Sequence, residues 1–395
     1  MTPNNHVITG RTLVLGDLHL VRETPTAVVD DLVSLVTSNP GARFVFLGDL
    51  FDLSADHPGT PKAHALREAI ACQPRVRRAL AEHVDRGGQI WLAGGNHDSA
   101  VGDPEHDDGL IEGLGLDTAA VRGRVRTSPW FFREGGLHLE HGHLYDPDNA
   151  TSHPLVSGVR SLGVHFVEEF IAPTGAFKYL NMNDELPLKM LLSAFTFYGV
   201  RGPYVIFKYF DAAFRAVAKS GPFFEGAVEQ LAGAALEADF KHEHGVSDDL
   251  LKAMLQLPAR PTMESFTATF QRLYLDRTGS TFAMMGGLGL LARGKRRAGA
   301  TLFGAGALTM GISWALNYDR YSGSVPQLLA DGAQRVVDAT GAKLVVMGHA
   351  HREALTDNYA NTGSFSFPRG APGRPYLEIE GTPDAPRAVR RYLAA

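Results

Sequence analysis

Apolar runs of four residues recur along the first hundred positions, and helix-like segments lie between them. The runs are 12–15, 44–47 and 90–93. Each has the length and the β-branched or aromatic content of a buried strand. Apolar positions on one face predict a helix that begins at Pro25 and ends before Asn39, and residues 62–85 read as a second helix that Gly87 ends. This β-α-β order predicts a sheet with helices on its faces.

Strand pairs replace the β-α-β order later in the chain. Residues 130–133 and 137–140 flank the short turn 134–136 and predict a hairpin. Three further strand-like segments are 343–347, 375–380 and 388–392. We therefore expect an α/β protein in which two sheets pack face to face as a β-sandwich and helices flank them on the outside.

Clusters of Asp, Asn and His follow five of the strand-like runs. They are GDLH at 16–19, GDLFD at 48–52, GNHD at 95–98, HGH at 141–143 and GHAH at 348–351. In α/β sheets the loops at the carboxyl ends of strands carry the functional site. One Gly-Asp or Gly-His pair is ordinary turn chemistry, but five clusters in these positions predict one shared site.

Seven side chains of these clusters form a complete ligand set for two adjacent divalent metal ions. They are Asp17, His19, Asp49, Asn96, His141, His349 and His351. A dinuclear centre needs one bridging carboxylate, and Asp49 is the natural bridge. Nitrogen and oxygen ligands without thiolate favour manganese, with iron, zinc or nickel as alternatives.

Two further residues suit proton transfer beside such a centre. His97 follows the expected ligand Asn96 and can reach a leaving-group oxygen as a general acid. We expect Asp98 to hold the His97 imidazole in the required tautomer. His143 and Asp52 are expected either to neighbour the site or to form turns.

The interval 153–335 contains none of the ligand clusters and reads as mostly helical and rich in aromatic residues. The expected organisation is a core in two parts, 1–152 and 336–395, with 153–335 as an inserted lid or substrate-capture subdomain. Aromatic residues at helical spacing more often form a helix core than contact a ligand, so they are not evidence for a lid. The lid role is expected because the insertion leaves the core after His141 and returns before His349.

Residues 298–316 carry no charge and would form a helix about 28 Å long. A single membrane crossing there would separate His141 from His349, which are expected to bind one metal. The segment 282–316 is therefore expected to be either a buried helical pair or a pair that dips into one leaflet. Its basic turn, Arg293 to Arg297, suits anionic head groups or a diphosphate.

The composition describes a globular protein without a global attraction to nucleic acid. The chain has 395 residues, 44% apolar residues, a net charge of −5 and one cysteine, Cys72. A single cysteine fits a reducing compartment, and the first residues lack a signal-peptide pattern. We expect a cytoplasmic protein without a nucleic-acid partner. Of the two alternatives for 282–316, the pair that dips into one leaflet would give peripheral contact at the anionic inner face of the membrane.

The five clusters, in this order, resemble those of the calcineurin-like metallophosphoesterases, over residues 11–152 and 336–395. The resemblance implies a four-layer fold and His97 as the histidine of the Asn-His-Asp motif. It also implies two ligand groups: Asp17, His19, Asp49 and His351 for one metal, and Asp49, Asn96, His141 and His349 for the other.

A finer resemblance is to bacterial UDP-diacylglucosamine pyrophosphatases, through the compact layout and the tail Asn361 to Ser364. The chain departs from that pattern at His97, where those enzymes often carry Arg, and at His143, where they carry Asp.

The expected activity is metal-dependent hydrolysis of a phosphomonoester or phosphoanhydride in a small, nucleotide-linked or lipid-linked substrate. The alternatives are a serine/threonine-type protein phosphatase or a nuclease. A further alternative is a non-catalytic scaffold of the same fold, and the loss of ligand residues would indicate that case.

Overall fold

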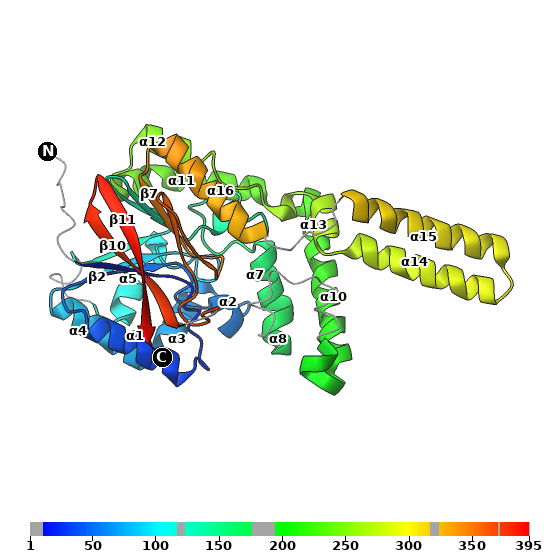
Figure 1. Ribbon diagram of the computed structural model, residues 1–395, viewed down its shortest axis with the longest axis horizontal. Coiled ribbons are helices and arrows are strands. Elements are labelled where there is room, and N and C mark those ends of the chain that lie inside the picture. Colours follow the sequence, from blue (N-terminus) through cyan, green and yellow to red (C-terminus); the bar gives the residue numbers. More distant parts are fainter. Residues whose placement is uncertain (1–10, 117–122, 176–193, 317–323, 370–371, 395) are drawn as a thin grey trace. The chain divides into compact units, whose positions relative to one another are not determined.

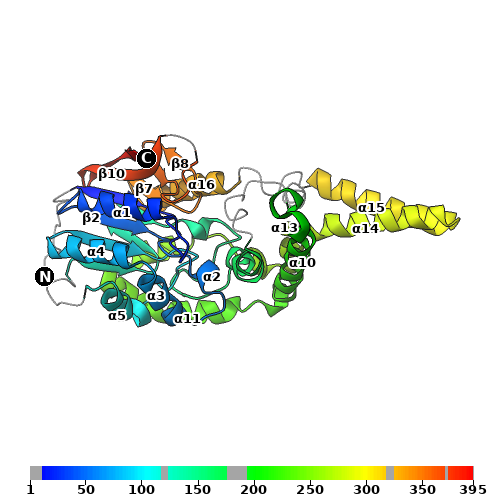
Figure 2. The same ribbon diagram turned by 90° about the horizontal axis from the view of Figure 1, so that it is seen from below.

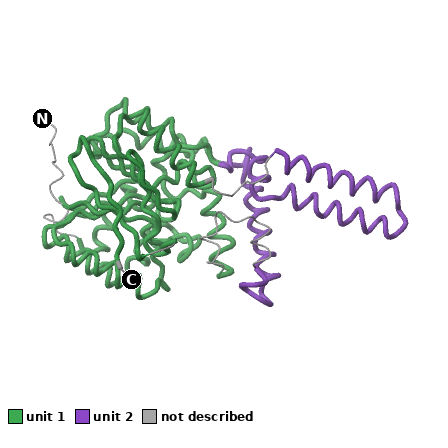
Figure 3. Tube along the Cα trace, in the orientation of Figure 1, with its two compact units in different colours: residues 1–175, 225–261, 325–395 green, residues 176–224, 262–324 purple. Residues whose placement is uncertain are grey.

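The chain forms two compact units (Figure 3). The first contains residues 1–175, 225–261 and 325–395, and the second contains 176–224 and 262–324. The computed structural model describes residues 11–116, 123–175, 194–316, 324–369 and 372–394. The expected insertion, 153–335, is thus shared between the two units.

The first unit contains two mixed sheets (Figure 1). The six-stranded sheet has the order β11 (Ala385–Ala394), β10 (Gly373–Thr382), β1 (Thr12–Leu15), β2 (Arg43–Leu47), β3 (Gln89–Ala93) and β4 (Val125–Ser128). The five-stranded sheet has the order β5 (Phe131–Glu134), β6 (Leu137–Glu140), β7 (Leu344–Met347), β9 (Tyr359–Thr362) and β8 (Glu353–Leu355). The expected hairpin is β5 and β6, which pair antiparallel. Strands β1 to β4 run parallel, and β6, β7 and β9 run parallel in the other sheet.

Alternation along the strands sends side chains into separate hydrophobic layers. On β2, Val45 and Leu47 join the core between the two sheets, whereas Phe44 and Phe46 join the core beneath the outer helices. On β7, Val346 belongs to the core between the sheets. Successive residues of a strand point to opposite faces, so strands that are apolar throughout are buried on both faces.

Helices cover the outer face of each sheet (Figures 1 and 2). Beside the first sheet lie α1 (Thr26–Thr37), α3 (Lys62–Ala71), α4 (Pro74–Asp85) and α5 (Pro104–Gly113). Beside the second lie α11 (Gly226–His244), α12 (Asp248–Met254) and α16 (Ser324–Thr340). The expected α/β class, with two sheets flanked by helices, is confirmed.

The expected single helix at 62–85 is wrong, because it is two helices. Gln73 leaves the helical conformation at φ −117° and ψ 55°, and Pro74 begins α4. Proline has no N–H to donate and disfavours a helical residue before it, so α3 ends and α4 starts at this point.

The remaining elements of the first unit are short, whereas the described part of the second unit contains long helices as well as shorter elements. The first unit also has α2 (Leu53–Asp56), α7 (Leu162–Phe166), the π-helical turn η2 (Val167–Ile171), α8 (Ala172–Thr174) and the 3₁₀ turn η1 (His143–Tyr145). The second unit has α10 (Gly202–Ala218), α13 (Phe266–Arg272), α14 (Leu275–Ala292), α15 (Arg296–Leu316) and the 3₁₀ turns η4 (Gly199–Arg201), η5 (Gly221–Phe223) and η6 (Thr262–Glu264).

Candidate metal centre

The expected ligands lie in loops that leave parallel strands at their carboxyl ends. Asp17 follows β1, Asp49 follows β2 and Asn96 follows β3, while His141 follows β6 and His349 follows β7. Parallel neighbours end at the same edge of a sheet, so each sheet delivers its ligands to one place. The core between the two sheets then holds these edges together.

Five of the expected ligands have a left-handed backbone. Their φ angles are 54° at Asp17, 45° at His19, 51° at Asp49, 63° at His349 and 50° at His351. Elsewhere in the described part of the chain, Tyr274 is the one non-glycine residue with positive φ. Left-handed residues with a side chain cost about 1–2 kcal/mol each, or about 5–10 kcal/mol here. That sum rivals the net stability of a domain, and backbone strain of this kind concentrates at functional sites.

The glycines that precede the ligands allow the loops to approach one another. A Cβ on Gly95 would lie 2.1 Å from Asp49 Oδ1 and 2.6 Å from the Asp49 backbone nitrogen. A Cβ on Gly48 would lie 2.4 Å from the His141 ring, and one on Gly348 would lie 2.7 Å from Asp17 Oδ2. These three glycines are therefore required by contacts with the expected ligands of other loops.

The Asp49 carboxylate lies between histidines of the two expected ligand groups. Its Oδ2 lies 3.6 Å from His19 Nε2 and 3.3 Å from His141 Nε2. Its Oδ1 accepts a hydrogen bond from the His97 backbone nitrogen at 2.9 Å, which fixes the orientation of the carboxylate. One oxygen of Asp49 thus faces histidines of both expected ligand groups.

Besides Asp49, the first expected ligand group contains Asp17, His19 and His351, whose donor atoms lie within 4.8 Å of one another. His351 Nε2 is 3.2 Å from Asp17 Oδ1 and 3.0 Å from His19 Nε2. Two ring nitrogens bound at about 2.1 Å to one ion, at right angles, would be about 3.0 Å apart. The donor types and this spacing fit a transition-metal ion.

The second ligand group surrounds His141. Its Nδ1 donates to the Leu47 carbonyl oxygen at 2.9 Å, because a carbonyl can only accept. In the neutral imidazole, the form that binds a metal, the lone pair is therefore on Nε2, which lies 3.1 Å from Asn96 Oδ1 and beside Asp49. A fixed tautomer of this kind is typical of histidine metal ligands.

His349 lies next to this group, with its ring centroid 5.2 Å from that of His141. It does not belong to the sets of donor atoms that lie within 4.8 Å of one another in the described residues. Its Nε2 is instead 3.1 Å from Asp146 Oδ2, which also accepts from Asn149 Nδ2 at 2.7 Å. The sequence analysis did not identify Asp146, because it lies outside the five clusters. Its position three residues after the HGH cluster was the available signal.

The expected partner of His97 is wrong. The His97 Nδ1 atom lies 2.9 Å from Asp52 Oδ1. The Asp98 carboxylate points elsewhere and accepts hydrogen bonds of 2.8–3.2 Å from four backbone nitrogens, those of Asp49, Leu50, Phe51 and Gly95. Adjacent residues of a tight loop point in different directions, so Asp98 fixes the loop of Asp49 and Asp52 orients the imidazole.

Residues 10–188 match the calcineurin-like phosphoesterase family. The matched range includes Asp17, Asp49, Asn96, His97 and His141, and it ends before His349. No curated protein matches the chain. The match and the clustered carboxylates and imidazoles together support a metal-dependent phosphoesterase.

The charges at this candidate site are mutually stabilising. Burial opposes ionisation of Asp49, but His141 and His97 hold its pKa well below the usual range. Burial also opposes the charged form of His97, yet the carboxylates of Asp52 and Asp49 raise its pKa to about 10. Two bound cations would oppose that rise and would bring the pKa of His97 closer to the neutral range, where a general acid works best.

His143 and Asp52, which the sequence placed either beside the site or in turns, both lie beside the expected metal ligands. The His143 ring centroid is 5.3 Å from that of His141, and the side chain is buried. Asp52 contacts His97, and its Oδ2 is 3.4 Å from His19 Nδ1. It also caps α2 by accepting from the Ala55 backbone nitrogen at 2.9 Å. One carboxylate therefore contacts both an expected metal ligand, His19, and the candidate acid, His97.

Proposed function

We propose that the chain is a dinuclear-metal phosphohydrolase that cleaves a phosphomonoester or phosphoanhydride of a small, nucleotide-linked or lipid-linked substrate. The observation that carries the proposal is the position of Asp49 Oδ2, which faces His19 on one side and His141 on the other. A scaffold that had lost the chemistry would have no reason to keep left-handed backbone at the ligand positions.

Asp17, His19, Asp49 and His351 would hold one ion, and Asp49, Asn96, His141 and His349 the other. We propose manganese as the native metal, with iron, zinc or nickel as alternatives. When bound, the ions supply an activated water and stabilise the charge that develops on the phosphoryl oxygens.

His97 supplies the proton in this proposal. Asp52 holds Nδ1, so the proton on Nε2 is the one that moves to the leaving oxygen as the bond between phosphorus and that oxygen breaks. The leaving group then departs as a neutral alcohol or as a protonated phosphate. Asp98 acts indirectly, because it holds the backbone of the Asp49 loop.

A small cavity beside the metal centre is the proposed position of the substrate's polar part. Its lining includes Asn96, Ser99, His143, Asn149 and Ser157. Amide and hydroxyl groups of this kind hydrogen-bond phosphate or sugar oxygens, and Asn149 also contacts Asn96 at 3.1 Å.

A substrate panel assayed with manganese tests the proposal. It contains para-nitrophenyl phosphate, a nucleoside diphosphate linked to a lipid, a phosphoserine peptide and single-stranded DNA. We expect manganese-dependent hydrolysis of the monoester or the lipid-linked diphosphate, and the loss of that hydrolysis in Asp49→Ala. Preferential cleavage of the peptide or the DNA would support the alternative enzyme classes, and no hydrolysis of any substrate by metal-loaded protein would contradict the proposal.

A further inference from the structure

The helical hairpin of α14 and α15 carries its large apolar side chains on the outside. Phe282 is 67% exposed and Leu308 is 65% exposed. Met285, Leu288, Ile312, Trp314 and Leu316 are also exposed. In the described part of the chain, α15 is the one helix long and apolar enough to cross a membrane, and its buried residues are only Gly299 and Gly306. The core helix of a soluble protein would be mostly buried, so the expected alternative of a buried helical pair is wrong.

The inside of the hairpin is formed by small residues. A Cβ on Gly287 would lie 2.6 Å from the Phe303 backbone nitrogen, and one on Gly306 would lie 2.7 Å from the Ser280 carbonyl oxygen. Ser280 Oγ and Thr309 Oγ1 hydrogen-bond across the pair at 2.9 Å. Close backbone approach at small residues, with a hydroxyl bond between the helices, is typical of helix pairs in membranes.

Between residues 298 and 316, the sides of α15 that do not face α14 carry only uncharged and mostly apolar residues. At 3.6 residues per turn, Leu308 lies about 180° around the helix from Gly299, which faces α14. Leu316 lies about 100° to one side of Gly299 and Trp314 about 60° to the other, and both are exposed. An interfacial amphipathic helix needs a polar face, and a protein partner needs only one apolar stripe, so this all-round distribution favours lipid as the occupant.

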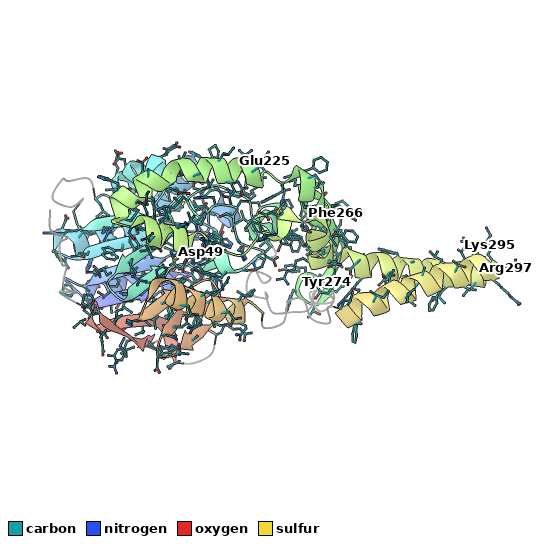
Figure 4. All side chains as sticks on the ribbon, turned by 90° about the horizontal axis from the view of Figure 1, so that it is seen from above. Asp49, Glu225, Phe266, Tyr274, Lys295 and Arg297 are labelled. Carbon is teal, nitrogen blue, oxygen red and sulfur yellow. The ribbon has the colours of Figure 1, made fainter. Side chains whose placement is uncertain are left out.

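Charges bound the apolar zone at both ends. Residues 278–292 and 298–316 carry none, and these lengths correspond to about 22 Å and 28 Å of helix. The tip carries exposed Arg293, Lys295, Arg296 and Arg297, none of which pairs with a carboxylate in the described residues; Figure 4 shows Lys295 and Arg297 there. At the other end Asp276 and Arg277 contact Ser313. The hydrocarbon core of a bilayer is about 30 Å thick, and long basic side chains reach its surface from slightly short helices.

We propose that the α14–α15 hairpin crosses a lipid bilayer twice, with its basic tip at the membrane face opposite to the chain that precedes α14 and follows α15. Two crossings keep His141 and His349 on one side, which a single crossing by α15 would not. Insertion of the tip into one leaflet alone would place four cations in hydrocarbon, which is costly. The inference is independent of the proposed hydrolytic activity and goes beyond the peripheral contact expected from the sequence.

Helix α10 of the same unit suits the membrane surface beside the hairpin. Tyr204, Phe207 and Phe214 are exposed on it, and Figure 1 shows α10 running across the direction of the hairpin. The Tyr209 hydroxyl lies 3.4 Å from the Leu273 carbonyl oxygen, close to the start of α14. Aromatic side chains are enriched where a membrane protein meets the head groups.

Membrane fractionation of the full chain tests the proposal. Wild-type protein should sediment with membranes, resist high salt and alkaline carbonate, and dissolve in detergent. Met285→Arg with Leu308→Arg places one charge near the middle of each helix, and we expect at least a tenfold rise in the carbonate-soluble fraction. The matched control, Leu231→Arg with Leu355→Arg, adds the same charge at exposed apolar positions of the first unit and should stay in the membrane.

The proposal is overturned if wild-type protein is soluble without detergent, as a monomer, as a dimer of this chain or with a protein partner. It is also overturned if both double variants stay in the membrane. Metal-dependent hydrolysis of a small ester, measured in parallel, shows that each variant is folded and keeps this test separate from that of the proposed function.

Thiol labelling tests the double crossing directly. In a Cys72→Ser background, Lys295→Cys marks the tip and Asp357→Cys marks the exposed turn between β8 and β9. A membrane-impermeant maleimide applied to intact spheroplasts should label one of the two, and should label the other only after lysis. Equal labelling of both before lysis, or of neither, would show that tip and turn share one side and would overturn the crossing.

Discussion

Gly95→Ala isolates the contact between two ligand loops without removing a metal ligand. The added Cβ would lie 2.1 Å from Asp49 Oδ1 and 2.6 Å from the Asp49 backbone nitrogen, where ordinary contacts exceed 3.4 Å. Asp49 must therefore move by about 1 Å, and overpacking of this size costs about 1–3 kcal/mol of unfolding free energy. Loss of a residue that only supports a ligand lowers metal affinity about 10–100-fold, and displacement of the bridge itself should cost at least as much.

The assay is calorimetric titration of chelator-treated protein with manganese, together with thermal unfolding and hydrolysis of para-nitrophenyl phosphate. Gly109→Ala is the matched control, because Gly109 lies within α5 and its Cβ would meet no atom within 4 Å. The control should bind metal normally and gain about 1 kcal/mol of stability. Wild-type metal affinity and turnover in Gly95→Ala would refute the reasoning that Gly95 sets the position of the bridge.

Further predictions concern the bridge, the acid and one carboxyl outside the site. Asp49→Ala should weaken binding of both metals and abolish turnover. His97→Ala should keep the metals but lower turnover about 10²–10⁴-fold, and the loss should be smaller for substrates with good leaving groups. Equal metal loss in both variants would contradict these roles. Burial raises the pKa of Asp107 to about 6, and a hydrogen bond from Thr127 only partly offsets this. Because the pKa of Asp107 is higher in the folded state than in the unfolded state, ionisation of Asp107 destabilises the fold. The unfolding free energy of Asp107→Asn should therefore rise by about 1–3 kcal/mol relative to that of wild type between pH 4 and pH 7. Denaturant unfolding at both pH values measures this, and a pH-independent difference would contradict it.

The fold was largely predictable because its strands are short, apolar and bounded by turns. Val14, Val45 and Trp91 all belong to the core between the sheets, and their neighbours belong to the outer core, as period-two alternation requires. The break at Pro74 was visible in the sequence as well, but the apolar face of 62–85 continues across it and favours one helix.

The sequence predicted which residues lie at the site better than it predicted which of them contact one another. The clusters identify which residues leave the strands, whereas the pairing of His97 with Asp52 depends on how the β2 and β3 loops pack. Asp146 shows the same limit, because its contact with His349 joins positions that are 203 residues apart. In α15, Gly299 and Gly306 lie seven residues apart, a spacing visible in the sequence, but only the structure shows that they face α14.

The central claim is a dinuclear metal centre, and metal analysis tests it most directly. Protein purified without chelator, and the same protein reloaded with manganese after chelation, should each contain two transition-metal ions per chain. Asp49→Ala should contain fewer, and hydrolysis should be lost on chelation and restored by the metal. One ion or none per wild-type chain, with no activation on adding manganese, would contradict the account.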